Sequence, residues 1–357
     1  MKKSFIHING IKYDYQEIFV MVLDLLLLKS SPPEWKVKGL LFISELLDPH
    51  VSSFQFNTSG TTGDPKEIFF SKKQILYSAE NTCQFFGLSA SSKLFLCLPA
   101  DFVAGRMMIA RAFYVGADLM WVEPTLNPLK DIDPLVINFA AFTPAQVANI
   151  INDPLTCALF ESIEKVIIGG GEMSNVLENE LIEFRNQIFV TYGMTETLTH
   201  IAVRKIGEQI YHSIYKDCTF SVDENNCLCI ELPFISNERI ITKDLVELIN
   251  HQSFVWKGRL DNVINTGGIK LYAEEIEKKL LKAELLKEGT FYISSHQDNI
   301  FGQVPVIVLL NATIDIEVAE LLTTINQLLN KHELIKHVLF FDKFEYTKTG
   351  KLKRARF

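Results

Sequence analysis

Hydroxyl-bearing residues and glycines crowd one short stretch of the chain, T-S-G-T-T-G-D-P-K, between Thr58 and Lys66. Glycines let backbone N–H groups point at an anion, while hydroxyls and a lysine add donors and positive charge. The stretch could therefore hold phosphate groups, although the same composition is also typical of a solvent-exposed turn. It differs from the G-x-x-x-x-G-K-[ST] nucleotide loop, because no Ser or Thr follows Lys66.

Three further segments follow in order: T-Y-G-M-T-E-T at 191–197, G-R-L-D-N at 258–262 leading into N-T-G-G at 265–268, and T-G-K at 349–351. Together with the first stretch they resemble the adenylate-forming superfamily, which comprises acyl-CoA synthetases, nonribosomal adenylation domains and luciferases. The resemblance extends from about Phe56 to the C-terminus. A single short motif of this kind could arise by chance, whereas four in the same order are hard to explain that way.

The resemblance implies an enzyme that uses ATP and Mg²⁺ to activate a small carboxylic acid and then transfers the acyl group to coenzyme A. Such an enzyme must orient the triphosphate and neutralise charge at the α-phosphate. The implied ATP-binding residues are Thr58, Ser59, Gly60, Thr61, Thr62, Gly63, Lys66, Gly169, Gly170, Gly171, Glu172, Tyr192, Gly193, Met194, Thr195, Asp244 and Arg259.

Roles within this set also follow from the resemblance. Tyr192 would stack on adenine, Thr195 would contact the α-phosphate, and Glu196 would bind Mg²⁺, a hard ion that prefers carboxylate oxygen. Asp244 would accept hydrogen bonds from the ribose hydroxyls. The resemblance gives Lys351 the role of catalytic lysine, so the catalytic set is Lys351, Thr195 and Glu196.

On the coenzyme A side, the resemblance makes Asp261 the hinge of a mobile small domain, with Gly267 and Gly268 nearby. Without the resemblance, Arg259 and Asp261 would be an exposed loop ion pair of little energetic weight. Two positions depart from the usual pattern: Lys243 stands where glycine is common, and Glu345 stands where proline is common.

The segment 98–111, L-P-A-D-F-V-A-G-R-M-M-I-A-R, resembles in particular the compact o-succinylbenzoate–CoA ligases of menaquinone biosynthesis. Such a substrate keeps a second carboxylate, and burying it requires a cationic or multi-donor partner. The candidate acid-pocket residues are Phe102, Arg106, Arg111 and His200, and many relatives carry His at the position of Phe102. Arg106 is favoured for the second carboxylate. Each of Arg106, Arg111 and His200 could instead be structural, and Arg111 could extend along its helix to solvent.

Three other functions stay open at this point. The chain could activate another aryl or short-chain acid, or it could load a carrier protein, although no carrier module follows Phe357. It could also be a nucleotide-binding regulatory protein without catalysis. Retention of Glu196, Asp244 and Lys351 argues against that last possibility, since binding alone does not require the lysine.

Alternating strands and helices must position these loops. Apolar runs at 93–99, 165–169 and 188–193 predict buried strands closed by Gly or Pro. Ser71 and Gln74 form a capping box before a helix that ends near Gly87, and Ser174 opens another helix reaching Phe184. This alternation predicts an α/β large N-terminal domain with mixed β-sheets.

The pattern changes after Trp256. A helix is predicted from Ala273 to Leu286, strands at 291–294, 304–310 and 337–341, and a helix from about Ile316 to Lys331. These elements form a small α+β C-terminal domain joined by a hinge. The predicted domains are residues 1–258, which bind ATP and acid, and 259–357, which carry the catalytic lysine.

Composition narrows the class of protein. The chain has 357 residues, 48% hydrophobic and 22% charged, with a net charge of −8 and six cysteines. This charge argues against a nucleic-acid-binding surface, and the cysteine spacings favour reduced thiols over disulfides or zinc. The most apolar stretch, Phe19 to Leu28, is about half the ~20 residues of a membrane span. A cytoplasmic enzyme is expected, and its oligomeric state is not readable.

Overall fold

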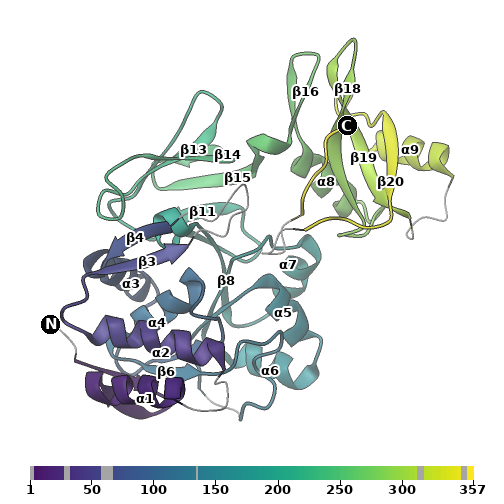
Figure 1. Cartoon of the computed structure of the whole chain (residues 1–357). Coiled ribbons are helices and arrows are strands. Elements are labelled where there is room, and N and C mark those ends of the chain that lie inside the picture. Colours follow the sequence, from purple (N-terminus) through teal and green to yellow (C-terminus); the bar gives the residue numbers. More distant parts are fainter. Residues whose placement is uncertain (1–3, 28–32, 58–66, 134–135, 312–316, 347–351) are drawn as a thin grey trace. The chain divides into compact units, whose positions relative to one another are not determined.

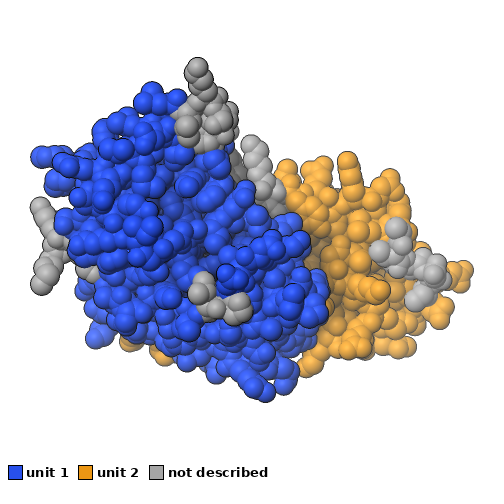
Figure 2. Space-filling view, turned by 90° about the horizontal axis from the view of Figure 1, so that it is seen from below, with its two compact units in different colours: residues 1–173, 177–218, 231–239 blue, residues 174–176, 219–230, 240–357 orange. Residues whose placement is uncertain are grey.

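The computed structural model describes residues 4–27, 33–57, 67–133, 136–311, 317–346 and 352–357 (Figure 1). The chain divides into two compact units, which Figure 2 colours separately. Unit 1 comprises residues 1–173, 177–218 and 231–239, and unit 2 comprises 174–176, 219–230 and 240–357. Residues 240–258, which the sequence prediction placed in the large domain, cluster with unit 2. The functional domain boundary at 258/259 stays a prediction.

The sheet of unit 1 runs in the order β11-β10-β9-β8-β7-β5-β6-β1-β2. Its strands from β9 to β1 in this order are parallel, and β10, β11 and β2 pair antiparallel with their neighbours. The bounds are β1 Phe5–Ile8, β2 Ile11–Asp14, β5 Lys93–Leu96, β6 Asp118–Trp121, β7 Phe139–Phe142, β8 Lys165–Ile168, β9 Gln187–Gly193, β10 His200–Lys205 and β11 Ile210–Ser213. The predicted strands at 93–99, 165–169 and 188–193 are thereby confirmed.

Helices fill the connections between these strands, as expected for parallel crossovers. They are α1 Tyr15–Leu27, α2 Glu34–Leu47, α3 Lys72–Phe85, α4 Val103–Val115, α5 Pro144–Ile151, α6 Pro154–Ser162 and α7 Asn175–Leu181. The predicted capping box is present at α3, where Ser71 accepts from the backbone N–H of Gln74 and the Gln74 side chain accepts from that of Ser71. A second capping box joins Thr143 and Gln146 at α5. Helix α7 ends at Leu181, one turn earlier than predicted.

Helix α4 is the centre of this unit because elements pack on it from both sides. It contacts β1, β5 and β6, while α2 and α3 pack on α4 and α1 packs on α2. Residues from Met107 to Ala112 are accordingly buried all round the helix, including the polar Arg111. A helix that is apolar all round is typical of such a sandwiched position.

A separate antiparallel ribbon is formed by β3 Ser53–Asn57 and β4 Glu67–Ser71. Its last register pair joins Asn57 to Glu67, and the phosphate-loop candidate lies between these two residues in the sequence. Phe56 packs edge to face on Phe42 and Phe70, which anchors the ribbon to the core of unit 1.

Unit 2 contains two sets of paired strands. The first has the order β12-β13-β14-β15, and the second comprises β17-β16-β19-β18 with β20 paired parallel to β19. The bounds are β12 Thr219–Val222, β13 Cys227–Glu231, β14 Ile240–Asn250, β15 Ser253–Arg259, β16 Val263–Thr266, β17 Ile269–Tyr272, α8 Ala273–Lys282, β18 Phe291–Asp298, β19 Gly302–Leu310, α9 Val318–Gln327 and β20 His337–Phe341. Buried residues of α8, α9, β18 and β19, among them Ile276, Ile293, Ile307 and Ile325, share one hydrophobic core.

Both predicted helices of this unit are present but shorter than predicted. Helix α8 stops at Lys282 instead of Leu286, because the backbone turns left-handed at Glu284, where φ is 55°. Helix α9 covers the middle of the predicted range. The predicted α/β large part with a small α+β part is confirmed. Within the described part of the chain, no helix is long and apolar enough to cross a membrane.

The C-terminal residues 352–357 run beside β18 and are tied to it by backbone hydrogen bonds, including Phe357 N to Ser295 O at 3.0 Å. Arg354 forms a bidentate ion pair with Glu277 of α8, with Nη2 2.8 Å from Oε2. Both side chains are largely buried. Burial raises the pKa of the Glu277 carboxyl, and Arg354 partly offsets this shift.

Replacing Arg354 by Met should therefore lower the free energy of unfolding by about 3 kcal/mol, because it leaves a buried carboxylate without its partner. The measurement is urea unfolding followed by circular dichroism. The matched control is Lys353→Met, whose exposed pair with Glu345 has a 3.9 Å separation and should be worth less than about 1 kcal/mol. Equal stability of the two variants would show that the buried pair contributes nothing.

Candidate active site

The carboxyl ends of β7, β8 and β9 meet at one edge of the unit 1 sheet. Their parallel register pairs Phe142 with Ile168 and Ile168 with Val190. The segments that follow, beginning at Thr143, Gly169 and Thr191, are consequently neighbours. Ligands of open α/β sheets bind outside this edge. The structure thus brings together two of the predicted nucleotide-binding segments, 169–172 and 192–196.

Gly169, Gly170 and Gly171 form the turn after β8. The Thr191 hydroxyl donates to the carbonyl of Ile168 at 3.2 Å, and a Cβ on Gly169 would overlap that hydroxyl. Gly170 has a φ of 79°, in the left-handed region that favours glycine. The first two glycines are therefore required by local geometry. Contact of this backbone with adenine stays a prediction, as does the role of Glu172.

Tyr192 is held by an aromatic and ionic network. Its ring lies edge-on to Tyr211 with centroids 5.9 Å apart, and the guanidinium of Arg204 lies 5.5 Å from the Tyr211 centroid. Arg204 pairs with Glu178 through two contacts of 2.5 and 2.7 Å. Sequence reasoning missed Arg204, Tyr211 and Glu178, because they lie on three different elements and form no local pattern.

The turn after Tyr192 is fixed from inside by Thr197. Its hydroxyl accepts from Met194 N at 3.0 Å and donates to Thr199 O at 2.7 Å. A Cβ on Gly193 would overlap the backbone of Thr199, so this position needs glycine. The buried Thr197 anchors the turn, while Thr195 is half-buried and Glu196 is exposed.

Arg111 and His200 lie together in the core of unit 1. Arg111 Nη2 is 3.5 Å from His200 Nδ1 and 3.4 Å from the Thr199 hydroxyl. Because arginine can only donate, Nδ1 accepts and Nε2 carries the proton, which it donates to Thr82 Oγ1 at 3.4 Å. The histidine is therefore neutral, and its pKa lies well below the ordinary value through burial and then through Arg111.

The alternative in which Arg111 extends to solvent is wrong, since its exposed fraction is 1%. Helices α2 and α3 cover α4 on the side away from the sheet. Burial lowers the pKa of Arg111 to about 10. Its Nε has no hydrogen-bond partner among the described residues, and no described carboxylate pairs with it. Arg111 is thus a desolvated cation with unused donor capacity.

Arg106 has different surroundings. Its Nε donates to Ala100 O at 2.7 Å and Nη1 donates to Gln55 O at 2.6 Å, while its guanidinium lies over the rings of Phe42 and Phe56. These contacts tie α4 to the β3–β4 ribbon, which is the structural alternative that sequence reasoning left open for Arg106. Phe102, just before α4, is 56% exposed.

In unit 2, the structure brings Asp244, Arg259 and Asp261 together. Arg259 bridges the two carboxylates, with contacts of 3.3 Å to Asp244 and 3.2 Å to Asp261. Trp256 Nε1 also donates to Asp244, at 3.4 Å. Lys243, at the position where the pattern has glycine, pairs with Asp261 at 2.9 Å. Burial opposes ionisation of Asp261, yet Lys243 and Arg259 hold its pKa below the ordinary value.

The remaining predicted residues fall in two groups. Gly267 and Gly268 form the β16–β17 hairpin turn with φ of 54° and 82°. Seven residues of the phosphate-loop candidate and the catalytic candidate lie outside the described residues: Thr58, Ser59, Gly60, Thr61, Thr62, Gly63, Lys66 and Lys351.

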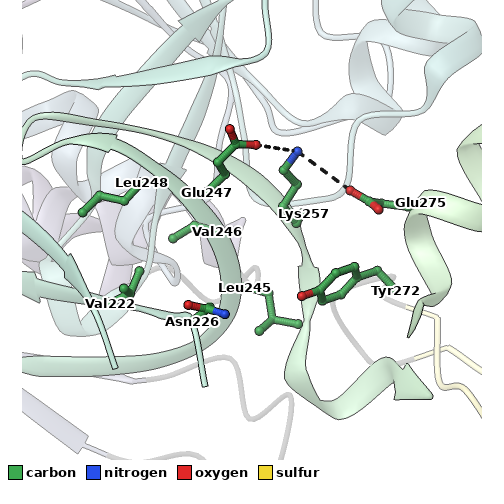
Figure 3. Close-up of a pocket in the computed structure, with 9 residues that line it drawn as sticks. All are labelled: Val222, Asn226, Leu245, Val246, Glu247, Leu248, Lys257, Tyr272 and Glu275. Carbon is green, nitrogen blue, oxygen red and sulfur yellow. Dashed lines mark ion pairs between the residues drawn. The ribbon is translucent and has the colours of Figure 1, made fainter. Parts of the chain in front are cut away.

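A cavity of about 530 Å³ in unit 2, where Lys257 lies between Glu247 and Glu275, includes none of the predicted site residues (Figure 3).

Residues 26–225 match the family model described as AMP-binding enzyme, which is more than half of the chain. The chain belongs to the AMP-binding enzyme family. A curated relative, 2-succinylbenzoate–CoA ligase of Staphylococcus epidermidis, is 24% identical over 350 residues, covering 87% of this chain and 72% of the relative.

Solved structures of AMP-binding enzymes have the same fold. An acyl-CoA synthetase (AMP-forming)/AMP-acid ligase II-like protein of Dyadobacter fermentans is 29% identical, with a TM-score of 0.62, over 91% of this chain and 94% of its own. The o-succinylbenzoate coenzyme A synthetase of Bacillus subtilis, in complex with ATP and magnesium ion, is 20% identical with a TM-score of 0.69, over 84% and 68%. The predicted class, AMP-forming acid–CoA ligase, is confirmed.

The neutral, buried His200 makes stability depend on pH. In the unfolded chain this histidine binds a proton below about pH 6.5, whereas in the folded enzyme it does not. Its contribution to stability is therefore complete above pH 6.5 and is lost as the pH falls. Between pH 7.5 and 5.5 we expect a loss of about 1.4 kcal/mol that is absent in His200→Gln, measured by urea unfolding at each pH. The exposed His212→Gln is the control and should keep the wild-type slope, and an unchanged slope in His200→Gln would contradict the assignment.

Proposed function

We propose that this AMP-binding enzyme activates o-succinylbenzoate as an acyl-adenylate, releases pyrophosphate, and then transfers the acyl group to coenzyme A. The observation that carries the proposal is Arg111, a buried cation without a described carboxylate partner, on the segment that resembles the o-succinylbenzoate ligases. The curated relatives named 2-succinylbenzoate–CoA ligase support the same substrate.

For ATP, the proposal uses the loops at the edge of the unit 1 sheet. Tyr192, which is held by Tyr211, would stack on adenine, against the backbone of Gly169 to Gly171. Thr195 would donate its hydroxyl to the α-phosphate. Asp244 would accept from the ribose hydroxyls, and Arg259, which already bridges Asp244 and Asp261, would hold that carboxylate in place.

Glu196 is proposed to bind Mg²⁺. Its exposed carboxylate is a hard oxygen ligand, and Mg²⁺ in such enzymes takes one or two carboxylates with the substrate phosphates and water. The described residues contain no group of three or more His, Cys, Asp or Glu that could hold a metal ion. When bound, the ion would neutralise phosphate charge.

The phosphates that leave would be held by Thr58 to Lys66, and Lys351 would bridge the attacking carboxylate and the α-phosphate. In that position a lysine stabilises charge that develops in the transition state. Arg354, three residues after Lys351, is fixed to Glu277, so the chain beyond the lysine is firmly attached to its unit.

For the second carboxylate, the contacts favour Arg111 over Arg106. The described donors of Arg106 are engaged by the carbonyls of Ala100 and Gln55, while Arg111 keeps an unpartnered Nε. A desolvated cation attracts an anion several ångströms away with little screening. His200 and Thr199 would keep Arg111 oriented, and Phe102 would line the acid entrance.

Transfer to coenzyme A would follow rotation at Asp261, with Gly267 and Gly268 on the coenzyme side. The alternatives are another aryl or short-chain acid, a carrier protein as acceptor, and nucleotide binding without catalysis. Turnover of other acids, adenylation without thioester formation when coenzyme A is added, and absence of pyrophosphate release would indicate these alternatives in that order.

Pyrophosphate release should be fastest with o-succinylbenzoate, and thioester should form only when coenzyme A is added. Arg111→Gln should raise the KM for this acid about 10- to 100-fold, because a charge-assisted interaction is lost. It should leave unchanged the KM for ATP and the KM for an analogue of o-succinylbenzoate that lacks the ring carboxylate. Steady-state kinetics on both acids provide the measurement.

Arg106→Gln is the matched control. It should lower stability but leave unchanged the ratio between the KM for o-succinylbenzoate and the KM for the analogue without the ring carboxylate. Equal losses on both acids in Arg111→Gln would remove Arg111 from substrate recognition. Turnover of other acids but not o-succinylbenzoate would contradict the substrate, and no pyrophosphate release with any acid would favour nucleotide binding alone.

Lys351→Ala should lower the rate of pyrophosphate release about 10²- to 10³-fold, while the dissociation constant for ATP stays near the wild-type value. Single-turnover pyrophosphate release and ATP titration calorimetry measure the two quantities. Lys353→Ala, two residues on, is the control for a general loss of positive charge. A normal rate in Lys351→Ala would exclude it from the chemistry.

A further inference from the structure

Helix α1 exposes a continuous apolar face. It packs on α2 and β2 at the outside of unit 1 (Figure 1). Five apolar side chains on the helix are exposed by 41% to 79%, namely Phe19, Val20, Leu23, Leu26 and Leu27. Single exposed apolar residues are ordinary, whereas a contiguous patch of several marks a contact surface.

The spacing shows that α1 has two apolar faces. Ile18 and Val22 are buried and account for its attachment to unit 1. The other side of the helix carries side chains at intervals of four, three and four residues, namely Gln16, Val20, Leu23 and Leu27. This is the spacing of the seam between two paired helices.

The exposed surface is uneven along the helix. Where the N-terminal half of α1 adjoins β2, a shallow hollow of about 360 Å³ is lined by Tyr13 of β2 and by Gln16, Glu17, Val20 and Met21 of the helix. Its C-terminal half ends in the most exposed of these side chains, Leu27, which is 79% exposed. In an antiparallel pair, the projecting end of each helix faces the hollow of the other.

We propose that α1 docks on α1 of a second copy of this chain, antiparallel and about a twofold axis. Val20 then meets the partner's Leu23, and Gln16 meets the partner's Leu27. In such an isologous contact, the N-terminal half of the face on each copy meets the C-terminal half of the face on the other copy. Antiparallel packing also places the two helix dipoles favourably.

Charge favours a protein partner over a lipid surface. Helix α1, Y-Q-E-I-F-V-M-V-L-D-L-L-L, contains Glu17 and Asp24 and no lysine or arginine. Helices that lie on membranes are typically rich in Lys and Arg on their polar face, which attracts anionic lipids. The acidic α1 would be repelled by such a surface.

The available area predicts a weak dimer. With side-chain areas of roughly 100 Å², the five residues offer about 300 Å² of apolar surface per copy. Because interfaces are about 60% apolar, the whole contact would bury on the order of 1,000 Å², near the lower limit for a specific interface. A dissociation constant in the micromolar range is expected.

Sedimentation velocity on the full chain, at roughly 1 to 200 µM, should show a concentration-dependent dimer. Leu23→Glu should raise the dissociation constant at least about tenfold, because it brings unpaired carboxylates into the contact. The control is Leu155→Glu on α6, where a leucine is also 79% exposed, and it should dimerise like wild type. Adenylation activity should be unchanged in both variants, since α1 lies beside the edge strand β2 and the candidate loops follow β8 and β9.

Disulfide trapping tests the orientation. A mixture of Gln16→Cys and Leu27→Cys should give a covalent heterodimer under mild oxidation, while neither variant alone should cross-link above the wild-type background. A parallel pair would do the opposite, because equivalent residues would then meet.

The outcomes separate the possibilities. A monomer throughout the concentration range, or a dimer that Leu23→Glu leaves intact, overturns the proposal. Binding of the monomer to vesicles of phosphatidylcholine and phosphatidylserine, abolished by Leu23→Glu, would assign the face to lipid instead. Cross-linking within each single variant would refute the antiparallel pairing.

Discussion

The parallel hydrogen-bond register of β7, β8 and β9 is the constraint on which the candidate active site depends. It places the residues after Phe142, Ile168 and Val190 at one sheet edge. Once the strands are in this register, the Thr191 hydroxyl occupies the space beside Gly169, so a side chain there would collide. The space between the strands thus requires glycine at this position, and the proposed nucleotide binding would act on the same turn.

Burial of polar groups is the second organising feature. Arg111, His200 and Thr82 come from α4, β10 and α3 and form a chain of long hydrogen bonds inside an apolar unit. Desolvation lowers the pKa of both basic groups, so the histidine is neutral. Within the described part of the chain, no carboxylate pairs with the arginine. Such an arrangement costs stability, which is understandable if a substrate carboxylate completes it.

Unit 2 uses ionic contacts in a different way. The cluster of Lys243, Arg259, Asp244 and Asp261 is held by contacts near 3 Å. Asp244 is buried, whereas Lys243, Arg259 and Asp261 are partly exposed, so solvent screens their mutual contacts and these can rearrange at little cost. The Arg354–Glu277 pair is shielded and therefore durable. A weak cluster at the candidate hinge and a strong pair three residues after the candidate catalytic lysine are compatible with the proposed rotation.

Local patterns in the sequence determined the strands before the glycine and tyrosine loops, the capping box at Ser71, and the order of the motifs that identifies the family. These depend on neighbouring residues alone. Only the tertiary structure decided that Arg111 is buried beside His200 and that Arg106 joins α4 to the β3–β4 ribbon. It also decided that Glu178 supports Tyr192 through Arg204 and Tyr211. Finally, it decided that Lys243 pairs with Asp261. Each of these contacts joins elements far apart in the chain, and a side chain's burial and charge partners depend on what the fold packs around it.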